Sequence, residues 1–249
     1  MDCTPAFLGR DVHLLKMLSE KSGINILTNT GYYGAVGYKY LPPWVYTDTV
    51  DQLAARWIDE ATHGIEGTGI KPGFIKISVN GNKLSDIERK LIRAAGITHR
   101  KTGLTICSHT GPAVAALDQL EELKSLKVNP NAFIWTHAQN ELNKTYYTQI
   151  AKMDAWVSLD GMGWGGLENY VQWLDLLKAN DCLHRVLISH DAGWYDPAKA
   201  QGGALKGYTD IIDKTIPLLI QKGFKSRHID QLLIKNPAEA FAIHTRIHA

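Results

Sequence analysis

The sequence predicts an α/β fold of the barrel type, in which parallel strands alternate with helices along the chain. Short apolar runs alternate without a break with stretches whose apolar residues recur at helical spacing. This alternation is typical of a parallel sheet with helical crossovers. In addition, polar side chains collect where the apolar runs end, and in barrels of this type the chemistry is assembled at the carboxyl ends of the strands.

Each predicted strand is a short run rich in aliphatic, β-branched and aromatic residues, which is the pattern of a strand buried on both faces. Six runs have this character, and residues 1–4 form a possible further stub. The six runs are INILTNT (24–30), GFIKISV (73–79), LTICSH (104–109), AFIWTHA (132–138), AWVSLDG (155–161) and RVLISHD (185–191).

Helical spacing of apolar residues marks the segments between these strands and one segment after the last of them. No linker rich in Gly, Pro or Ser divides the chain, so residues 1–249 are expected to form a single domain. The predicted helices cover residues 11–22, 49–65, 84–102, 113–126, 145–153, 168–180 and 208–223.

The composition excludes several classes of function. The chain has 249 residues, of which 45% are hydrophobic and 21% charged, with a formal net charge of +2. Neither a nucleic-acid partner nor a membrane partner is indicated, because no strong basic balance and no run of about 18 apolar residues is present.

Cys3, Cys107 and Cys182 form no CxxC motif and no disulfide framework, which favours a reducing compartment. A cytoplasmic location is the default expectation, although a signal peptide could lie upstream of Met1.

Five consecutive predicted strands carry a chemically active side chain at or near their carboxyl ends. These side chains are Lys76, His109, His137, Asp160 and Asp191. Imidazole and carboxylate groups bind zinc, manganese or cobalt and leave a coordination position open for water. The pattern therefore indicates a metal site, in which Asp191 would ligate the metal, take a proton from water, or do both.

The same residues lie in motifs that resemble the phosphotriesterase family of the amidohydrolase superfamily, over nearly the whole chain. The motifs are LGRD (8–11), ATHGIEGTGIKPGFIKI (61–77), SHTGPA (108–113), THAQNE (136–141), SHDAGWYDP (189–197) and NPAEAF (236–241). The resemblance implies a TIM (β/α)8-type barrel and a two-metal hydrolase that acts on a lactone or ester by attack of a metal-bound hydroxide. Phosphotriesterase activity would be secondary.

The resemblance also implies a role for each ligand. Lys76 matches a lysine that is carboxylated by carbon dioxide and bridges the two metals. His109 and His137 match the ligands of the more exposed metal, and Asp191 matches the catalytic aspartate that ligates the buried one. Zinc is the metal we expect, with manganese, cobalt or iron as alternatives.

One departure from the family pattern affects these expectations. The family supplies a His-x-His pair from its first strand, and none of the 10 histidines here forms such a pair. The barrel is therefore expected to be truncated at the N-terminus, with strand 1 and most of strand 2 missing. Such a chain should bind at most one metal well, on His109, His137 and Lys76. It should also cover its open edges as a homodimer. The alternative is a catalytically impaired remnant or fragment that serves as a binding or assembly module.

The remaining candidates surround the predicted ligands. Asp160 is either an acceptor that orients a ligand or a plain turn residue, and Asn140 stands where some relatives carry an aspartate near the catalytic one. Four aromatic residues are predicted either to form an apolar wall for a small-molecule substrate or to pack in loops: Tyr33, Trp164, Trp194 and Tyr195.

Other polar residues near these motifs are assigned structural roles. His190 is expected to be structural because neighbouring strand residues face opposite sides. Arg10 and Asp11 are expected to cap and anchor the first helix. The other histidines, His99 among them, are expected at the surface.

Overall fold

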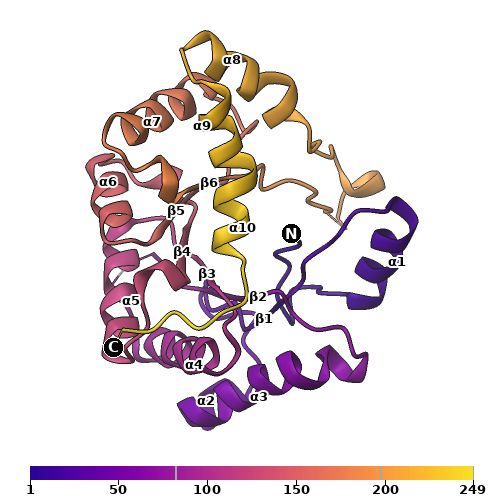
Figure 1. The fold of residues 1–249 in the computed structure, drawn as a ribbon. Coiled ribbons are helices and arrows are strands. Elements are labelled where there is room, and N and C mark those ends of the chain that lie inside the picture. The colour runs from indigo at the N-terminus through magenta and orange to yellow at the C-terminus, as the bar shows by residue number, and fades with distance from the viewer. Residues whose placement is uncertain (82, 197, 249) are drawn as a thin grey trace.

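A parallel sheet of six strands forms the centre of the computed structural model, which describes residues 1–81, 83–196 and 198–248. The strands follow one another in chain order across the sheet (Figure 1). This arrangement confirms the predicted α/β fold. The strands are β1 (Asn29–Thr30), β2 (Phe74–Ser78), β3 (Ile106–His109), β4 (Phe133–Thr136), β5 (Trp156–Leu159) and β6 (Val186–Ile188).

Helices connect the strands and continue beyond the last one. The first six predicted helices correspond to α1 and to α3 through α7, whereas α2, α9 and α10 were not predicted. The helices are α1 (Val12–Ser22), α2 (Trp44–Thr47), α3 (Val50–His63), α4 (Asp86–Thr102), α5 (Ala113–Ser125), α6 (Thr145–Lys152), α7 (Leu167–Ala179), α8 (Ile216–Gln221), α9 (Ser226–Asp230) and α10 (Asn236–Ala240).

Local sequence signals fix several helix starts. Thr49 and Gln52 form a capping box at the start of α3, as Ser85 and Glu88 do at the start of α4, so that backbone N–H groups of the first turn are satisfied. Asp11 caps α1 as predicted, since its side chain accepts a hydrogen bond from the backbone N–H of Leu14.

Arg10 does not cap the helix that follows it. It anchors the chain through a paired hydrogen bond to Glu60 of α3, with N···O distances of 2.9 and 3.2 Å, and through the carbonyl oxygen of Asn29. Only 2% of the Arg10 side chain is exposed, so this ion pair links the segment before α1 to α3 beneath the surface.

Two predicted elements differ from the structure. The predicted helix at 208–223 is interrupted, because residues Ile211–Thr215 form a wider π-helical turn before α8 begins at Ile216. Pro217 lacks a backbone N–H and cannot make the regular helical bond, which accounts for the widened turn. The predicted strand at 24–30 shortens to the two residues of β1, and the stub at residues 1–4 forms no strand.

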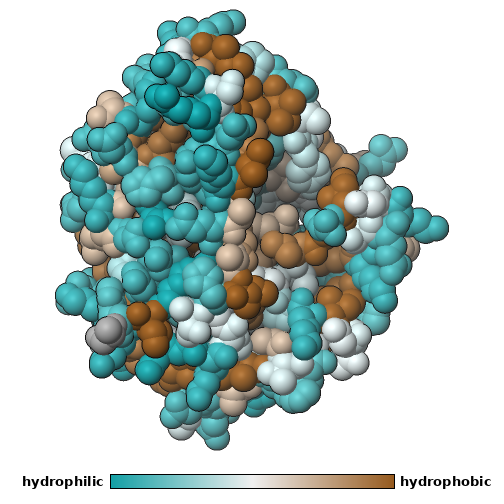
Figure 2. Space-filling view, in the orientation of Figure 1, coloured by the Kyte–Doolittle hydropathy of each residue, from teal (hydrophilic) through white to brown (hydrophobic). Residues whose placement is uncertain are grey.

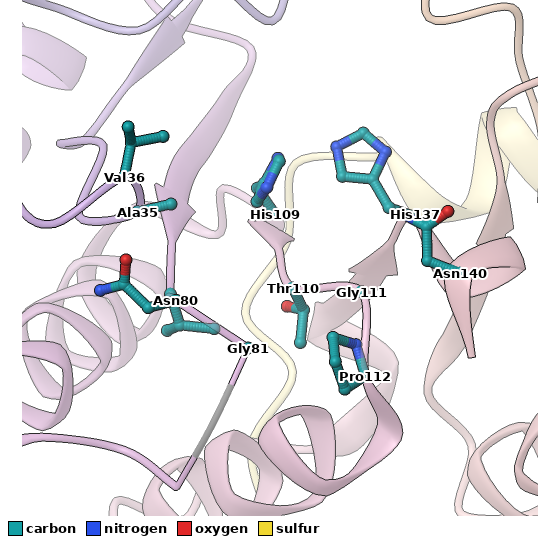
Figure 3. Close-up of a pocket in the computed structure, with 11 residues that line it drawn as sticks. Ala35, Val36, Asn80, Gly81, His109, Thr110, Gly111, Pro112, His137 and Asn140 are labelled. Atoms are coloured by element: carbon teal, nitrogen blue, oxygen red, sulfur yellow. The ribbon is translucent and has the colours of Figure 1, made fainter. Parts of the chain in front are cut away.

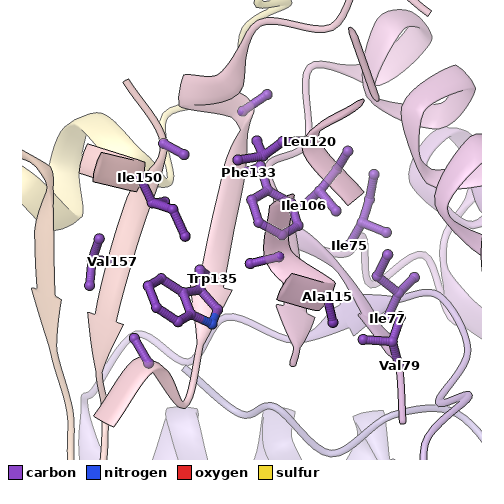
Figure 4. Packing of buried hydrophobic residues seen from close by; sticks show 14 of the residues in the cluster. Ile75, Ile77, Val79, Ile106, Ala115, Leu120, Phe133, Trp135, Ile150 and Val157 are labelled. Carbon is purple, nitrogen blue, oxygen red and sulfur yellow. The ribbon is translucent and has the colours of Figure 1, made fainter. Parts of the chain in front are cut away.

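The two faces of the sheet have different partners. One face packs against α3 through α7 in a large apolar core that includes Ile75, Ile106 and Trp135 (Figure 4). The other face carries a smaller cluster that packs against Ala240 and Phe241 at the end of α10. This smaller cluster consists of Phe74, Cys107, Ile134, Trp156 and Leu187. Because strand side chains alternate between faces, Lys76 lies on the same face as Phe74.

The sheet formed by the described residues is open, because β1 and β6 each pair with one strand only. In the segment that precedes β1, the helix α1 exposes 45 to 47% of Leu14, Met17 and Leu18. Apolar side chains are also visible between α10 and α1 in Figure 2. A closed eight-stranded barrel would cover such edges. The predicted homodimer would cover them in another way and stays a prediction.

One predicted surface residue is buried. His99 has no exposed surface, and its ring lies 2.9 Å from the carbonyl oxygen of Leu104 and contacts the backbone of Arg246. The expectation that His99 lies at the surface is therefore wrong, because the C-terminal segment folds back over α4. No helix within the described residues is long and apolar enough to cross a bilayer.

Candidate metal-binding active site

The predicted site residues lie together at the carboxyl edge of the sheet. Lys76 belongs to β2, His109 ends β3, His137 follows β4, Asp160 follows β5 and Asp191 follows β6. Adjacent parallel strands place these positions side by side, as the register of His109 opposite Thr136 illustrates. The chain therefore presents an amine, two imidazoles and two carboxylates along one edge.

His109 and His137 are in direct contact. Their ring centroids lie 4.3 Å apart with the planes inclined at 75°. The Nδ1 atom of each ring faces a protein partner, which is Asp160 for His137 at 2.7 Å and the Tyr33 hydroxyl for His109 at 3.2 Å. Neither Nε2 atom has a hydrogen-bond partner among the described residues, so both remain available to a ligand.

Asp160 holds His137 from two sides. Its carboxylate accepts hydrogen bonds from the ring and from the backbone N–H of His137, at 2.7 and 2.8 Å. Gln139 and Ser158 donate to the same carboxylate at 2.8 and 2.9 Å. A carboxylate behind an imidazole is the usual support of a metal-binding histidine, so the geometry matches an orienting residue rather than a plain turn.

Gln139 and Ser158 were absent from the predicted site. Ser158 precedes Asp160 by two residues and therefore shares its face of the strand, a signal that could have been used. Gln139 lies in the turn after His137. Only the fold shows that its amide nitrogen donates to the Asp160 carboxylate and that its amide oxygen accepts from the Asp160 backbone N–H.

Lys76 is buried and has no acceptor. Its exposed fraction is 4%, and its ammonium donates no hydrogen bond to any described residue. Gly31 packs directly against its backbone, so that a Cβ atom at position 31 would lie 2.2 Å from the carbonyl oxygen of Lys76. Burial lowers the pKa of Lys76, but Cys107, Cys3 and Asp160 raise it by more, and the net shift is upward.

The backbone is strained at two of the site residues. His137 and Asp191 have φ angles of 62° and 45°, a left-handed conformation that costs a residue with a side chain about 1 kcal/mol or more. Strain of this kind clusters at functional sites. The carboxylate of Asp191 accepts no hydrogen bond from the described residues, whereas its carbonyl oxygen accepts one from each of the indole N–H groups of Trp164 and Trp194 at 3.0 Å.

Electrostatics shifts the pKa values of the two imidazoles in opposite directions. Burial, together with the charges of His137 and Lys76, lowers the pKa of His109 to about 3, so that this ring is neutral as a metal ligand must be. Burial lowers the pKa of His137, but Asp160 outweighs it and the net shift is upward. Burial raises the pKa of Asp191.

A cavity of 330 Å³ lies beside the histidine pair (Figure 3). It extends between the chain segments that follow β1, β2, β3 and β4. Its lining consists of Ala35, Val36, Val79, Asn80, Gly81, His109, Thr110, Gly111, Pro112, His137 and Asn140. A small molecule in this cavity would touch both imidazoles.

The predicted substrate-binding aromatics do not line this cavity. Trp164, Trp194 and Tyr195 are 59 to 68% exposed on the loops after β5 and β6, and Tyr33 contacts His109 instead. Their substrate-binding role stays a prediction. Asn140 lines the cavity, and its side chain makes no hydrogen bond to a described residue.

Pro197, the last residue of the predicted SHDAGWYDP motif, lies outside the described residues. His190 is structural as expected, because its Nε2 accepts a hydrogen bond from the backbone N–H of Ile211 at 3.0 Å.

The imidazoles of His109 and His137 are two of the ligands that a divalent metal would need. Among the described residues, no three side chains drawn from His, Cys, Asp and Glu form a ready metal-holding cluster. The His109–His137 pair therefore needs a third ligand. A carboxylated Lys76 would supply it, and the Lys76 amine makes no hydrogen bond to a described residue that this change would break. Imidazole nitrogen and carboxylate oxygen together suit zinc or manganese.

Comparison with known proteins identifies the protein family of this chain. The sequence model of the phosphotriesterase family matches residues 1–241. The chain belongs to this family.

Relatives within the phosphotriesterase family have several named activities. The phosphotriesterase homology protein of Escherichia coli is 30% identical over 97% of this chain and 82% of its own length. An aryldialkylphosphatase of Saccharolobus solfataricus is 28% identical over 97% of this chain and 80% of its own length. The crystal structure of a lactonase from Listeria monocytogenes superposes with a TM-score of 0.87 at 25% identity, covering 98% of this chain and 81% of that one.

Proposed function

We propose that this phosphotriesterase-family chain is a metal-dependent hydrolase of a lactone or carboxylic ester. The observation that carries the proposal is the contact between His109 and His137, whose ring centroids lie 4.3 Å apart. Both rings have their Nδ1 atoms engaged. Their Nε2 atoms, and the nearby amine of Lys76, have no hydrogen-bond partner among the described residues.

A bound zinc ion would supply Lewis acidity toward the substrate oxygen and would activate water for attack. The imidazoles of His109 and His137 would hold the metal through their Nε2 atoms. Asp160 keeps the Nδ1 proton of His137 in place and so fixes the tautomer that leaves Nε2 free for binding.

Lys76 and Asp191 complete the proposed chemistry. Lys76, once carboxylated by carbon dioxide, would supply an oxygen ligand to the metal. Asp191 would accept the proton of the attacking water, because its carboxylate has no other partner among the described residues. Trp164 and Trp194 hold the Asp191 backbone in place through their indole N–H groups.

The substrate class is proposed from the relatives and the cavity. A lactonase and an aryldialkylphosphatase are both among the similar proteins, and the metal chemistry that opens a lactone also suits a phosphotriester. The cavity beside the histidines is small, at 330 Å³, and lies partly between apolar residues such as Val36, Val79 and Pro112. We therefore place lactone or ester hydrolysis first and phosphotriester hydrolysis as a secondary activity.

Turnover of a γ-lactone, an aryl ester and an aryl phosphotriester tests the proposal. The protein is loaded with zinc or manganese in bicarbonate buffer, and each rate is compared with that of the chelated protein. We expect lactone or ester hydrolysis that requires metal and falls at least about 100-fold in Asp191→Asn and in His109→Ala.

His184→Ala is the matched control, since His184 is exposed and precedes β6, at the end of that strand opposite to Asp191. Its activity should equal that of the wild type. A hydrolysis rate that is unchanged in both Asp191→Asn and His109→Ala would contradict the proposed site. Absence of any metal-dependent turnover would favour the binding module instead.

A further inference from the structure

A second cavity, of 440 Å³, lies apart from the histidine pair and has no part in the proposed chemistry. Its lining residues come from the segment before α1, the residues after β1, the start of α2, and α3 with the turn that follows it. It shares no lining residue with the cavity beside His109 and His137. Three of its lining residues are aromatic and five are charged, so both ring faces and ionic groups are available to a ligand.

Three aromatic rings that contact one another line this second cavity. The rings of Phe7, Tyr32 and Trp44 have centroid separations of 5.5 to 6.4 Å and interplanar angles of 57° to 73°. The indole N–H of Trp44 donates to the Tyr32 hydroxyl at 3.2 Å, which holds two of the rings together. Because the ring planes are steeply inclined, their faces point in different directions, as in the aromatic cages that bind quaternary ammonium groups.

One of these rings already attracts a positive charge. The guanidinium carbon of Arg56 lies over the Trp44 ring, 5.0 Å from its centroid, a distance at which the electrons of the ring face attract a cation. The Arg56 side chain is 47% exposed, and its Nε donates to Asp48 at 2.8 Å. An exposed side chain can move away from the ring at small cost, so this face is accessible to a competing cation.

The charged side chains of the second cavity favour a positive ligand. Arg56, Asp59 and Glu60 share one face of α3, because they lie three or four positions apart. The Arg10 side chain is only 2% exposed, and Glu60 and Glu66 hold its terminal nitrogens at 2.9 to 3.3 Å. By contrast, the side chains of Asp59 and Glu66 are 68 and 66% exposed, so carboxylate oxygens remain accessible to a ligand.

Two residues of the second cavity have a strained backbone. Phe7 and Glu66 have φ angles of 65° and 53°, a left-handed conformation that is unfavourable for residues with large side chains. Phe7 is also 54% exposed, although its ring is apolar. Strain of this kind persists where the surrounding structure enforces it, and it clusters at sites that hold ligands. The fold thus places an exposed ring and an exposed carboxylate at the same cavity at a conformational cost.

We propose that this second cavity binds a small organic cation with an ammonium head group. The ring faces of Phe7 and Trp44 would contact the head group, Glu66 would supply the opposite charge, and Arg56 would leave the Trp44 ring to the ligand. Because the cavity shares no residue with the candidate active site, the inference holds whether or not the chain hydrolyses anything.

Titration with three small molecules of similar shape and different charge tests the proposal. Choline is positive, 3,3-dimethylbutan-1-ol is its neutral analogue, and 3,3-dimethylbutanoate is negative. Binding to the full chain is followed at constant ionic strength by the NMR signal of the Trp44 indole N–H. We expect a saturable shift with choline, a dissociation constant at least about fivefold higher for the alcohol, and no saturable shift with the carboxylate.

Three results of this titration would overturn the proposal. Equal affinity for choline and the alcohol would show an apolar cavity without selectivity for charge. Tighter binding of the carboxylate would show an anion site at Arg10, whose buried Nε has no hydrogen-bond partner among the described residues. Absence of a saturable shift with choline would show that the cavity holds no ammonium group.

Substitutions at the second cavity separate charge from apolar contact. Phe7→Leu keeps an apolar side chain but removes a ring face, so choline should bind about two- to fivefold more weakly while the alcohol binds as before. Arg56→Gln removes the competing cation from Trp44 and should strengthen choline binding. Glu66→Gln should weaken it at least about twofold, whereas the matched control Glu121→Gln, which changes an exposed carboxylate on α5, should not. Unchanged choline affinity in all three cavity variants would place the binding elsewhere and overturn the assignment.

Discussion

Asp160 binds both the ring and the backbone of His137, with a distance of 2.7 Å from Oδ1 to Nδ1 and of 2.8 Å from Oδ2 to the backbone nitrogen. One buried carboxylate thus fixes the position and the tautomer of a proposed metal ligand. His137 also has a left-handed backbone, so these bonds offset part of the strain of placing its ring against His109.

Removing the charge of Asp160 should weaken metal binding without removing a ligand. In Asp160→Asn we expect zinc affinity to fall about 10- to 100-fold, because outer partners of metal-binding histidines contribute this much. Isothermal titration of zinc measures it. Asp175→Asn, which changes an exposed aspartate on α7, should keep the wild-type affinity. An unchanged affinity in Asp160→Asn would show that His137 is not a metal ligand.

Metal content should depend on carbon dioxide through Lys76. We expect one tightly held metal per chain after loading with zinc in bicarbonate buffer, because His109, His137 and carboxylated Lys76 form one three-ligand set. Plasma mass spectrometry gives the ratio. Lys76→Met removes the amine at similar volume and should reduce zinc affinity at least about tenfold and abolish the effect of bicarbonate. Two equally tight metals in the wild type would contradict the one-site expectation.

The sequence was sufficient to predict a parallel sheet with helical crossovers and to place Lys76, His109 and Asp191 at or near the carboxyl ends of its strands. Periodicity places each residue at a strand end, and parallel topology then brings those ends together. The shortened β1 escaped prediction because its pairing depends on a neighbour rather than on its own apolar residues. The break before α8 was visible in principle at Pro217, whose missing N–H disturbs any helix through it.

Contacts between distant segments set the remaining differences. Nothing in the local sequence around His99 indicates that the C-terminal segment near Arg246 folds over it. Such contacts depend on the curvature of the sheet, which arises from all strands together and not from any one of them.

Gly31 should be essential for the position of Lys76. In Gly31→Ala, the new Cβ would lie 2.2 Å from the Lys76 carbonyl oxygen, and the φ of 113° is unfavourable for alanine. We expect a loss of about 3 kcal/mol or more in the free energy of unfolding, measured with urea.

Gly23→Ala is the control, since its φ of 72° is also positive but no atom lies within 4 Å of the added carbon. That variant should lose only about 1 kcal/mol. Equal losses in the two variants would show that backbone strain, and not the contact with Lys76, limits position 31.

The ion cluster between α4 and α5 should make the free energy of unfolding depend on pH. Burial raises the pKa of Glu122, but hydrogen bonds from Arg93 and Arg89 outweigh it and the net shift is downward. The Nε of Arg93 lies 2.7 Å from its carboxylate, and only 10% of the Glu122 side chain is exposed. A lowered pKa means that the stabilisation is complete above the unfolded-state pKa, about 4.3, and disappears as the pH falls through the lower pKa of the folded state. Glu122→Gln should therefore lose about 1 kcal/mol of unfolding free energy at neutral pH, and its difference from the wild type should shrink as the pH falls below about 4.

Glu121→Gln, which changes the exposed neighbour, should match the wild type throughout. A constant difference between Glu122→Gln and the wild type across this range would mean that the side chain acts through packing and not through its charge.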